Sequence, residues 1–279
     1  LRSLLPEQGL VNGQWSQDSR AFRDWKALER KMLLDADRVV SVSPAMTGRV
    51  SDGNPGLRVE TIPNFVDLER FRPDENSRRE LRRELGIEER RVLVFCGTLG
   101  GRYPGDRIAE CVRIYFSAFG PESFFLLLSP SDEKRLAPLA GALLHDGLER
   151  GRDWECHSVE SGSVSRYLNA ADWSLLALAD SMNGVVQPLK FAEYMALGLP
   201  VLTHPANEEL VHLTRELGVG EVLDSSSGGS ELRRRLDSGQ ESMRAACLRV
   251  ARESYGLQVF AARYASIYRK LSERGPEDG

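Results

Sequence analysis

The stretch PLKFAEYMALGLPV, residues 188–201, decides the fold of this chain. Pro188 suits the first turn of a helix, where its missing N–H costs nothing. Gly198 is placed to end that helix in a left-handed conformation, and Pro200 prevents the helix from resuming. Val201 then begins a short apolar run that is typical of a buried strand. The stretch therefore predicts a helix over 188–197 that passes directly into a strand of a buried sheet.

One face of this predicted helix is apolar and the other carries a charged pair. The residues predicted to point inward recur at helical spacing and are Leu189, Ala192, Met195 and Ala196. Lys190 and Glu193 lie three apart, and therefore on one side, in the opening turns where free N–H groups and the helix dipole attract anions. A phosphate beside Lys190 and paired sugar hydroxyls on Glu193 would form a nucleotide-sugar pocket. The alternative is a solvated surface pair worth only about 0.2–0.5 kcal/mol.

Continuous apolar runs alternate with helical segments on both sides of this stretch. Four strands are predicted, over 92–96, 124–128, 153–157 and 173–178, and helices are predicted between them over 106–119, 132–148 and 164–170. Strands that are apolar on both faces and are joined by helices predict a Rossmann-like α/β fold, a parallel sheet with helices on both faces. Ligands of such sheets bind beyond the carboxyl ends of the strands.

A glycine-rich loop, CGTLGGRY at 96–103, follows the first of these strands. Gly97, Gly100 and Gly101 allow the backbone to approach a ligand closely, and exposed N–H groups there can hold a phosphate that Arg102 grips bidentately. The spacing is not G-x-G-x-x-G, so the dinucleotide fingerprint is not met. The alternative is a tight turn that carries a surface arginine.

A second loop, DSMNGVVQ at 180–187, connects the fourth predicted strand to the 188–197 helix. Its small and polar residues are expected to line the crevice from the same side as Lys190. Backbone groups of Gly184, Val185 and Val186 are then candidates for contacts with a sugar or diphosphate. The alternative is a plain connection between a strand and a helix.

Composition excludes several classes of protein. With 41% hydrophobic residues, 28% charged residues and a net charge of −4, the chain is an ordinary globular protein and not a general nucleic-acid binder. The four cysteines are scattered and form no metal-like cluster with the four histidines, so no metal is expected. Cys96 lies in an apolar run and is predicted to be a buried small hydrophobe. The scattered cysteines favour a reduced, cytoplasmic compartment. No apolar run approaches the length of a membrane span.

The segments outside the alternating pattern carry weaker signals. Residues 1–17 show little periodicity and are predicted to be a loop, and the charge run 78–83 is predicted to be a solvated helix face. Two helices, 230–237 and 241–254, are predicted after the sheet. A last helix is predicted over 257–273, and its apolar stripe has no obvious partner nearby in the sequence. We expect the stripe to be buried by packing within the protein, and one option is that the helix folds back onto the N-terminal part. Its tail, residues 275–279, is predicted to be disordered.

Four motifs in order resemble the family-four retaining glycosyltransferases, which have the GT-B fold. ERKMLLDADRVVSVS at 29–43 is similar to the end of that family's N-terminal domain. IPNFVD at 62–67 resembles its interdomain signature, with Phe65 where glycine is usual. FCGTLGGRY at 95–103 resembles the first loop of its C-terminal domain, and residues 188–201 match its P-x-KFxEYxAxGLPV block.

The resemblance covers residues 19–224 and implies an organisation into domains and an activity. The activity is transfer of a hexosyl-type sugar from a nucleotide-diphospho-sugar to an acceptor, with retention of configuration and without a metal. It places the protein in a bacterial-type pathway of glycan biosynthesis, with the missing part of the N-terminal domain available for peripheral contact at the inner membrane face. The implied domains are 1–62, a remnant of the acceptor-side domain; 63–73, the interdomain connection; 74–256, the nucleotide-sugar-binding domain; and 257–279, the C-terminal helix and tail.

The resemblance also implies roles for the candidate residues. By motif match, Arg102 and Lys190 would neutralise the diphosphate, and Glu193 would hold the ribose. Backbone groups near Gly97 and Gly184 would complete the pocket. Cationic side chains suit this place because negative charge develops on the leaving diphosphate as the glycosidic bond breaks.

Two departures from the family pattern shape these expectations. The first glutamate of the family's E-x7-E block would fall at position 185, which is Val185 here, so that contact is lost or is made by backbone. Only the last helix–strand–helix pieces of the first domain are expected before Pro63, and the chain is therefore predicted to bind donor weakly and to turn over little. A non-catalytic nucleotide-sugar-binding or partner subunit is the alternative. An epimerase of the same architecture would need catalytic acids and histidines that are not evident.

Overall fold

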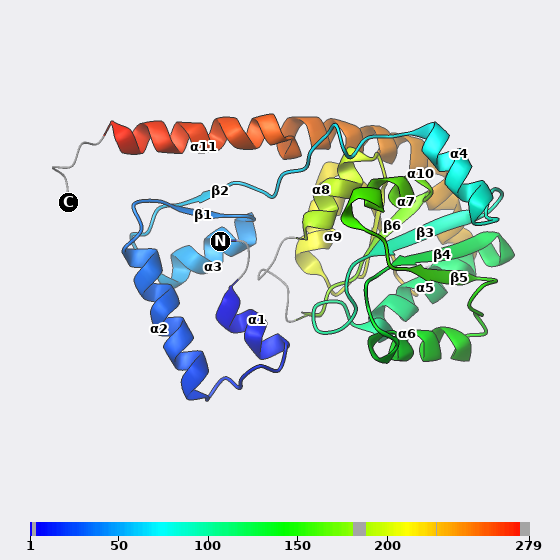
Figure 1. The fold of residues 1–279 in the computed structure, drawn as a ribbon, viewed down its shortest axis with the longest axis horizontal. Helices are drawn as coiled ribbons and strands as arrows, with labels where there is room; N and C mark the ends of the chain where they lie inside the picture. The colour runs from blue at the N-terminus through cyan, green and yellow to red at the C-terminus, as the bar shows by residue number, and fades with distance from the viewer. Residues whose placement is uncertain (2–3, 181–187, 227, 274–279) are drawn as a thin grey trace.

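The computed structural model describes residues 1, 4–180, 188–226 and 228–273. Its main body is a six-stranded parallel sheet in the order β5-β4-β3-β6-β7-β8, with helices on both faces (Figure 1). This confirms the Rossmann-like α/β fold predicted from the alternating apolar runs. The strands are β3 (Arg91–Cys96), β4 (Ser123–Leu128), β5 (Trp154–His157), β6 (Trp173–Leu176), β7 (Val201–Thr203) and β8 (Gly220–Val222).

The strand order reverses between β3 and β6. The chain runs outward from β3 to β5 and then returns to β6, beside β3, where Leu93 pairs with Trp173. Because each crossover between parallel strands is right-handed, this reversal places the two sets of helices on opposite faces. The carboxyl ends of β3 and β6 therefore mark the switch point at which ligands of such sheets bind.

Helices complete this domain and begin where the sequence supplies caps. Asp74 and Asp132, for example, accept backbone N–H hydrogen bonds at the starts of their helices. None of the helices within the described ranges is long and apolar enough to cross a membrane. The helices are α4 (Glu75–Glu84), α5 (Gly105–Phe119), α6 (Glu133–His145), α7 (Val164–Asn169), α8 (Leu189–Ala196), α9 (Glu208–Leu217), α10 (Gly229–Val250) and α11 (Leu257–Ser272).

Helix α8 is the helix that the 188–201 stretch predicts. Pro188 immediately precedes it, and Gly198 ends it with a φ of 61°. From Phe191 to Val201 the chain is almost entirely buried. Leu189, however, is 47% exposed, so the prediction that it points inward is wrong. Leu189 lies in the first turn, before the helix enters the core.

Replacing Gly198 by alanine is expected to destabilise the fold by about 1–2 kcal/mol. An L residue is strained at this left-handed φ, and a Cβ atom would stand 3.1 Å from Leu248 Cγ. Gly141 within α6 is the matched control, because a Cβ atom there meets open space. Gly141→Ala is expected to stabilise by about 0.5–1 kcal/mol. Urea unfolding measures both, and equal midpoints for Gly198→Ala and the wild type would contradict the first expectation.

The N-terminal part is a separate, smaller layer built on two parallel strands. Its elements are α1 (Leu5–Val11), α2 (Arg20–Leu34), β1 (Val39–Ser41), α3 (Pro44–Gly53) and β2 (Val59–Thr61), with β1 paired to β2. The prediction that residues 1–17 form a loop is wrong, because α1 lies within them. Trp15 donates from Nε1 to the Pro6 carbonyl at 2.9 Å and packs over Gly9, where a Cβ atom would stand 2.0 Å from the ring. The contact with Trp15 thus stabilises α1, and the spacing of apolar residues within the helix does not predict this contact.

Helix α10 corrects the prediction of two helices at 230–237 and 241–254. One helix runs without a break from Gly229 to Val250 and continues as a π-helical turn at 251–255. Gly239 lies within it, at the point where a break was expected. A glycine in a helix interior costs only about 1 kcal/mol, and buried side chains on both halves of α10 outweigh that cost.

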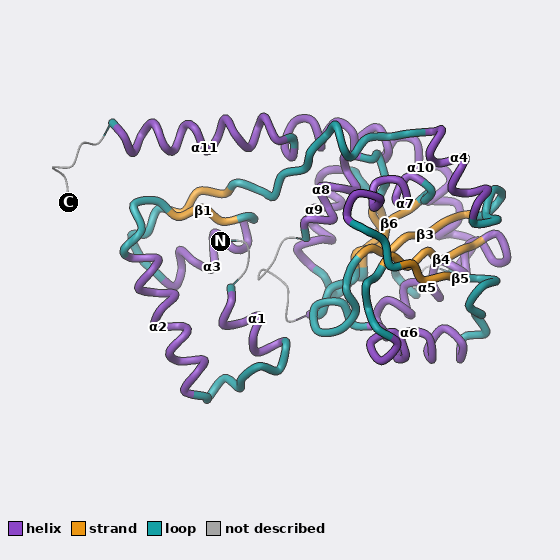
Figure 2. The backbone as a smooth tube through the Cα atoms, in the orientation of Figure 1, coloured by secondary structure: helices purple, strands orange, loops and turns teal. Residues whose placement is uncertain are grey.

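Helix α11 returns from the sheet domain to the N-terminal part (Figure 2). The ring of Phe260 lies 4.1 Å from that of Phe65, centroid to centroid, and Arg263 donates from Nη1 to the Thr61 carbonyl at 3.3 Å. The folding back that the sequence left open is therefore what the structure adopts. The predicted disordered tail, 275–279, lies outside the described residues.

The charge run 78–83 is only partly a solvated face, which corrects its prediction. Arg82 is buried and donates to Asp172 at 3.3 Å, and Arg78 forms an ion pair with the same carboxylate. Asp172 also accepts from the Val92 backbone N–H at 2.7 Å. This cluster joins α4 to the amino-terminal ends of β3 and β6, away from the switch point.

Candidate functional site

The glycine-rich loop at 97–103 leaves the carboxyl end of β3 and folds into a tight turn. Gly100 and Tyr103 exchange backbone hydrogen bonds of 3.0 and 2.8 Å. Gly100 has a φ of 102° and Gly101 one of 41°, conformations that favour glycine. At Gly97 a Cβ atom would stand 3.1 Å from the Phe95 ring, so the glycine there keeps the backbone close to its neighbours. The loop is thus a tight turn, as in the alternative from the sequence, and the predicted contacts of its backbone N–H groups with a phosphate stay a prediction.

Arg102 and Lys190 both influence one buried hydroxyl group, that of Tyr103. Burial raises the pKa of that hydroxyl, while the positive charges of Arg102 and Lys190 act on it in the opposite direction. The charges of the two predicted cations, which are 88 positions apart in sequence, therefore both influence the Tyr103 hydroxyl.

Lys190 is held as a cation beside a buried carboxylate. Its Nζ lies 2.8 Å from Glu193 Oε2. Burial alone would lower the pKa of Lys190, but Cys96 and Glu193 more than offset this and raise its pKa above the ordinary value. Lys190 is therefore charged at neutral pH. The surface-pair alternative is excluded for Glu193, since its side chain is only 9% exposed.

Cys96 and Tyr194 connect the two elements that carry these charges. Cys96 is buried, as predicted, and burial raises the pKa of its thiol. Its backbone N–H donates to the Tyr194 hydroxyl on α8 at 3.3 Å. The second half of α8 is therefore attached to the end of β3 at Tyr194.

The second predicted loop is described only at its edges. Gly184 and Val185 lie outside the described residues, so their predicted contacts stay predictions. At the near edge, Asp180 forms an ion pair with Arg107 of α5, which lowers the pKa of Asp180. Asn207, which the sequence analysis did not single out, hydrogen bonds to the backbone of Leu178, two residues before Asp180. Within the described ranges, no group of three or more His, Cys, Asp and Glu side chains is placed to bind a metal ion.

The N-terminal part reaches the glycine-rich loop through Asn12. This residue follows α1, and its Oδ1 atom stands 2.7 Å from the position that a Cβ atom of Gly101 would take. No sequence signal near Asn12 predicts this contact, because it depends on how the two parts of the chain pack. The candidate site therefore lies against both parts of the molecule.

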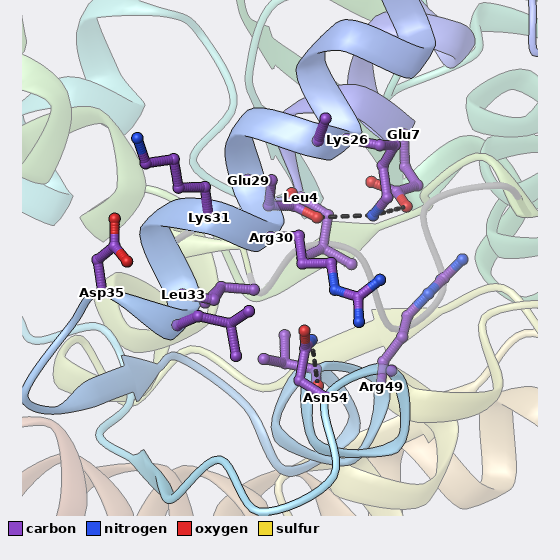
Figure 3. Close-up of a pocket in the computed structure, with 14 residues that line it drawn as sticks. Leu4, Glu7, Lys26, Glu29, Arg30, Lys31, Leu33, Asp35, Arg49 and Asn54 are labelled. Atoms are coloured by element: carbon purple, nitrogen blue, oxygen red, sulfur yellow. Dashed lines mark hydrogen bonds and ion pairs between the residues drawn. The ribbon is translucent and has the colours of Figure 1, made fainter.

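A separate cavity of about 720 Å³ lies in the N-terminal part, between α2 and α3 (Figure 3). Lys26 is bound there between Glu7 and Glu29, at 2.9 and 2.6 Å. Arg30 and Arg49 also line it, from the C-terminal halves of their helices. None of the candidate donor-binding residues that the structure describes lines this cavity, so it is distinct from the site at the switch point.

Comparison of the sequence with known proteins finds no match. No protein-family model and no curated protein matches this chain. The family that the motifs resemble is therefore not established by sequence.

Comparison of the structure gives clear similarities. Anabaena Alr3699/HepE in complex with UDP aligns with a TM-score of 0.73 and 15% identity, over 97% of this chain and 71% of that one. Sucrose-phosphate synthase from Thermosynechococcus elongatus aligns with a TM-score of 0.69 and 18% identity, over 95% of this chain and 66% of that one. WaaG, a glycosyltransferase involved in lipopolysaccharide biosynthesis, aligns with a TM-score of 0.65 and 18% identity, over 84% and 64%. At these identities the similarity shows the fold, which is that of GT-B glycosyltransferases.

Proposed function

We propose that this chain is a retaining glycosyltransferase that takes a hexosyl-type sugar from a nucleotide-diphospho-sugar. The observation that carries the proposal is that the loop of Arg102 and the helix of Lys190 are both attached at the switch point: the Arg102 carbonyl accepts from the Ala179 N–H beyond β6, and the Cys96 N–H at the end of β3 donates to Tyr194 of α8. The fold supports it, since structural neighbours include glycosyltransferases and HepE complexes with UDP and with UDP-glucose. Retention and the hexosyl donor rest on the motif resemblance.

The proposed roles follow from charge and position. Arg102 and Lys190 would bind the diphosphate, and backbone N–H groups near Gly97 and in the Gly184 region would complete its coordination. Glu193, buried beside Lys190, would accept hydrogen bonds from the ribose hydroxyls. In this proposal the two cations stabilise the negative charge that develops on the leaving diphosphate, and no metal is needed.

Nucleotide binding tests this proposal directly. We expect the chain to bind a nucleoside diphosphate, and isothermal titration with UDP, GDP and ADP measures which base is preferred. UDP is the first choice because the HepE structures contain it. Adenosine, which has no phosphate, is the control and should not bind. Equal, negligible heat with all three diphosphates would contradict the proposal.

A non-catalytic nucleotide-sugar-binding subunit is the second candidate, favoured by one residue. Val185 stands where the resembled family carries a glutamate, and a valine offers no carboxylate to the sugar. Both candidates predict binding, so only turnover separates them. Release of UDP from UDP-sugar in the presence of acceptor extracts supports the enzyme. Because little turnover is expected of this chain, binding without release supports the subunit only if it is also found when the complete N-terminal domain is present.

The cellular setting is part of the same proposal. A glycosyltransferase of this kind would work in the cytoplasm, in a pathway of glycan biosynthesis, with contact at the inner face of the membrane. WaaG, one structural neighbour, is involved in lipopolysaccharide biosynthesis. Fractionation of cells that express the protein, with and without high salt, measures whether it associates with the membrane.

A further inference from the structure

The carboxyl end of β6 is held by an unusual side chain. Asn207 is completely buried, and its carboxamide makes two hydrogen bonds to a single residue just beyond the end of β6. Its Oδ1 accepts from the Leu178 N–H at 2.8 Å, and its Nδ2 donates to the Leu178 carbonyl at 2.9 Å. The last backbone pair between β6 and β7 joins Leu176 to Thr203. Beyond this last pair, the carboxamide of Asn207 makes the hydrogen bonds to the Leu178 backbone that a further residue of β7 would otherwise make.

The position of Asn207 makes this use of its side chain specific. It is the N-cap residue of α9, a place where asparagine ordinarily accepts a hydrogen bond from the first turn of its own helix. Here the side chain makes no such bond and faces β6 instead. The first turn of α9 gives up a cap that is typically worth about 1 kcal/mol. The arrangement thus favours the position of Leu178 over the local stability of α9.

Two further contacts connect the backbone at Leu178 to the candidate site. Arg107 donates from Nη1 to the same Leu178 carbonyl at 2.9 Å and forms an ion pair with Asp180. Between these two residues, the Ala179 N–H donates to the Arg102 carbonyl at 2.9 Å. The exit of β6 and the glycine-rich loop are therefore joined at Arg102 itself.

We propose that Asn207 is a positioning residue for nucleotide binding, which acts by fixing Leu178 and, through Ala179, the backbone at Arg102. This inference rests on the proposed function, because it assigns Arg102 to the diphosphate. Asn207 need not touch the ligand. Its hydrogen bonds set where the Arg102 backbone lies and where the chain enters the segment after Asp180.

The test replaces Asn207 by serine, which can cap α9 but is too short to bridge to Leu178. We expect the Kd for UDP to rise about ten-fold, since a net hydrogen bond is worth about 1 kcal/mol and the change loses one or two. Leu210→Ala is the matched control, because it removes buried side-chain volume from α9 and leaves the two hydrogen bonds between Asn207 and Leu178 in place. It should lower the Tm at least as much as Asn207→Ser and leave UDP affinity within two-fold of wild type.

A double-mutant comparison separates positioning from general loosening. If Asn207 acts through Arg102, then Asn207→Ser should weaken UDP binding in the wild type and add little in the Arg102→Ala background. Full additivity of the two losses, or an Asn207→Ser variant that binds UDP as tightly as the wild type, would overturn the proposal.

Amide exchange distinguishes this inference from the proposed function. If the wild-type chain binds no nucleotide, the proposed function fails. Hydrogen–deuterium exchange at the Leu178 and Ala179 amides then measures whether Asn207 holds this backbone in place. Asn207→Ser should speed exchange at both amides by about ten-fold relative to Leu210→Ala. Unchanged exchange at these two amides would show that Asn207 does not hold the exit of β6.

Discussion

Lys190→Met is expected to weaken UDP binding by about 10- to 100-fold. A charge-assisted hydrogen bond contributes about 1.5–3 kcal/mol, and each 1.4 kcal/mol is ten-fold in Kd. Methionine keeps the length and apolar stem of lysine but removes the charge that Cys96 and Glu193 hold in place. Isothermal titration with UDP measures the effect, with the Tm recorded to show that the variant is folded.

Two controls make this result specific to the site. Lys134→Met removes an exposed lysine from α6 of the same domain and should leave UDP affinity unchanged. Lys190→Arg keeps a positive charge and should recover part of the affinity that Lys190→Met loses. An affinity for Lys190→Met within two-fold of the wild type would remove Lys190 from the proposed site.

Asp172→Ala is expected to destabilise the protein by about 3–5 kcal/mol, the cost of breaking a buried ion pair from one side. The change leaves Arg82 buried without its carboxylate and takes the acceptor from the Val92 N–H. For a domain of this size the Tm should fall on the order of 10 °C. Differential scanning calorimetry measures it.

The matched control for this prediction is a carboxylate in an ordinary surface pair. Asp24 lies 3.5 Å from Arg20 one turn away on α2, and both side chains are largely exposed. Asp24→Ala should therefore cost less than about 0.5 kcal/mol. Similar Tm values for Asp24→Ala and Asp172→Ala would show that the buried cluster contributes little.

The sequence determined the fold class and the main candidate residues of the site. Local rules suffice for α8, because proline at its start and a left-handed glycine at its end depend only on neighbouring atoms. Apolar runs buried on both faces identify the strands of a parallel sheet without knowledge of their order. The carboxyl ends of such strands then point to the loop of Arg102 and to the helix of Lys190 as candidates.

The tertiary structure alone decided which residues from distant parts of the chain meet. Nothing near Asn207 predicts that its side chain leaves its own helix for Leu178, and nothing near Arg82 predicts its burial against Asp172. Helix α1 forms because Trp15 packs over it, and the continuity of α10 reflects burial along both of its halves. Sequence patterns report the preferences of neighbours in the chain, whereas these contacts depend on packing between elements, whose free energy outweighs local propensity.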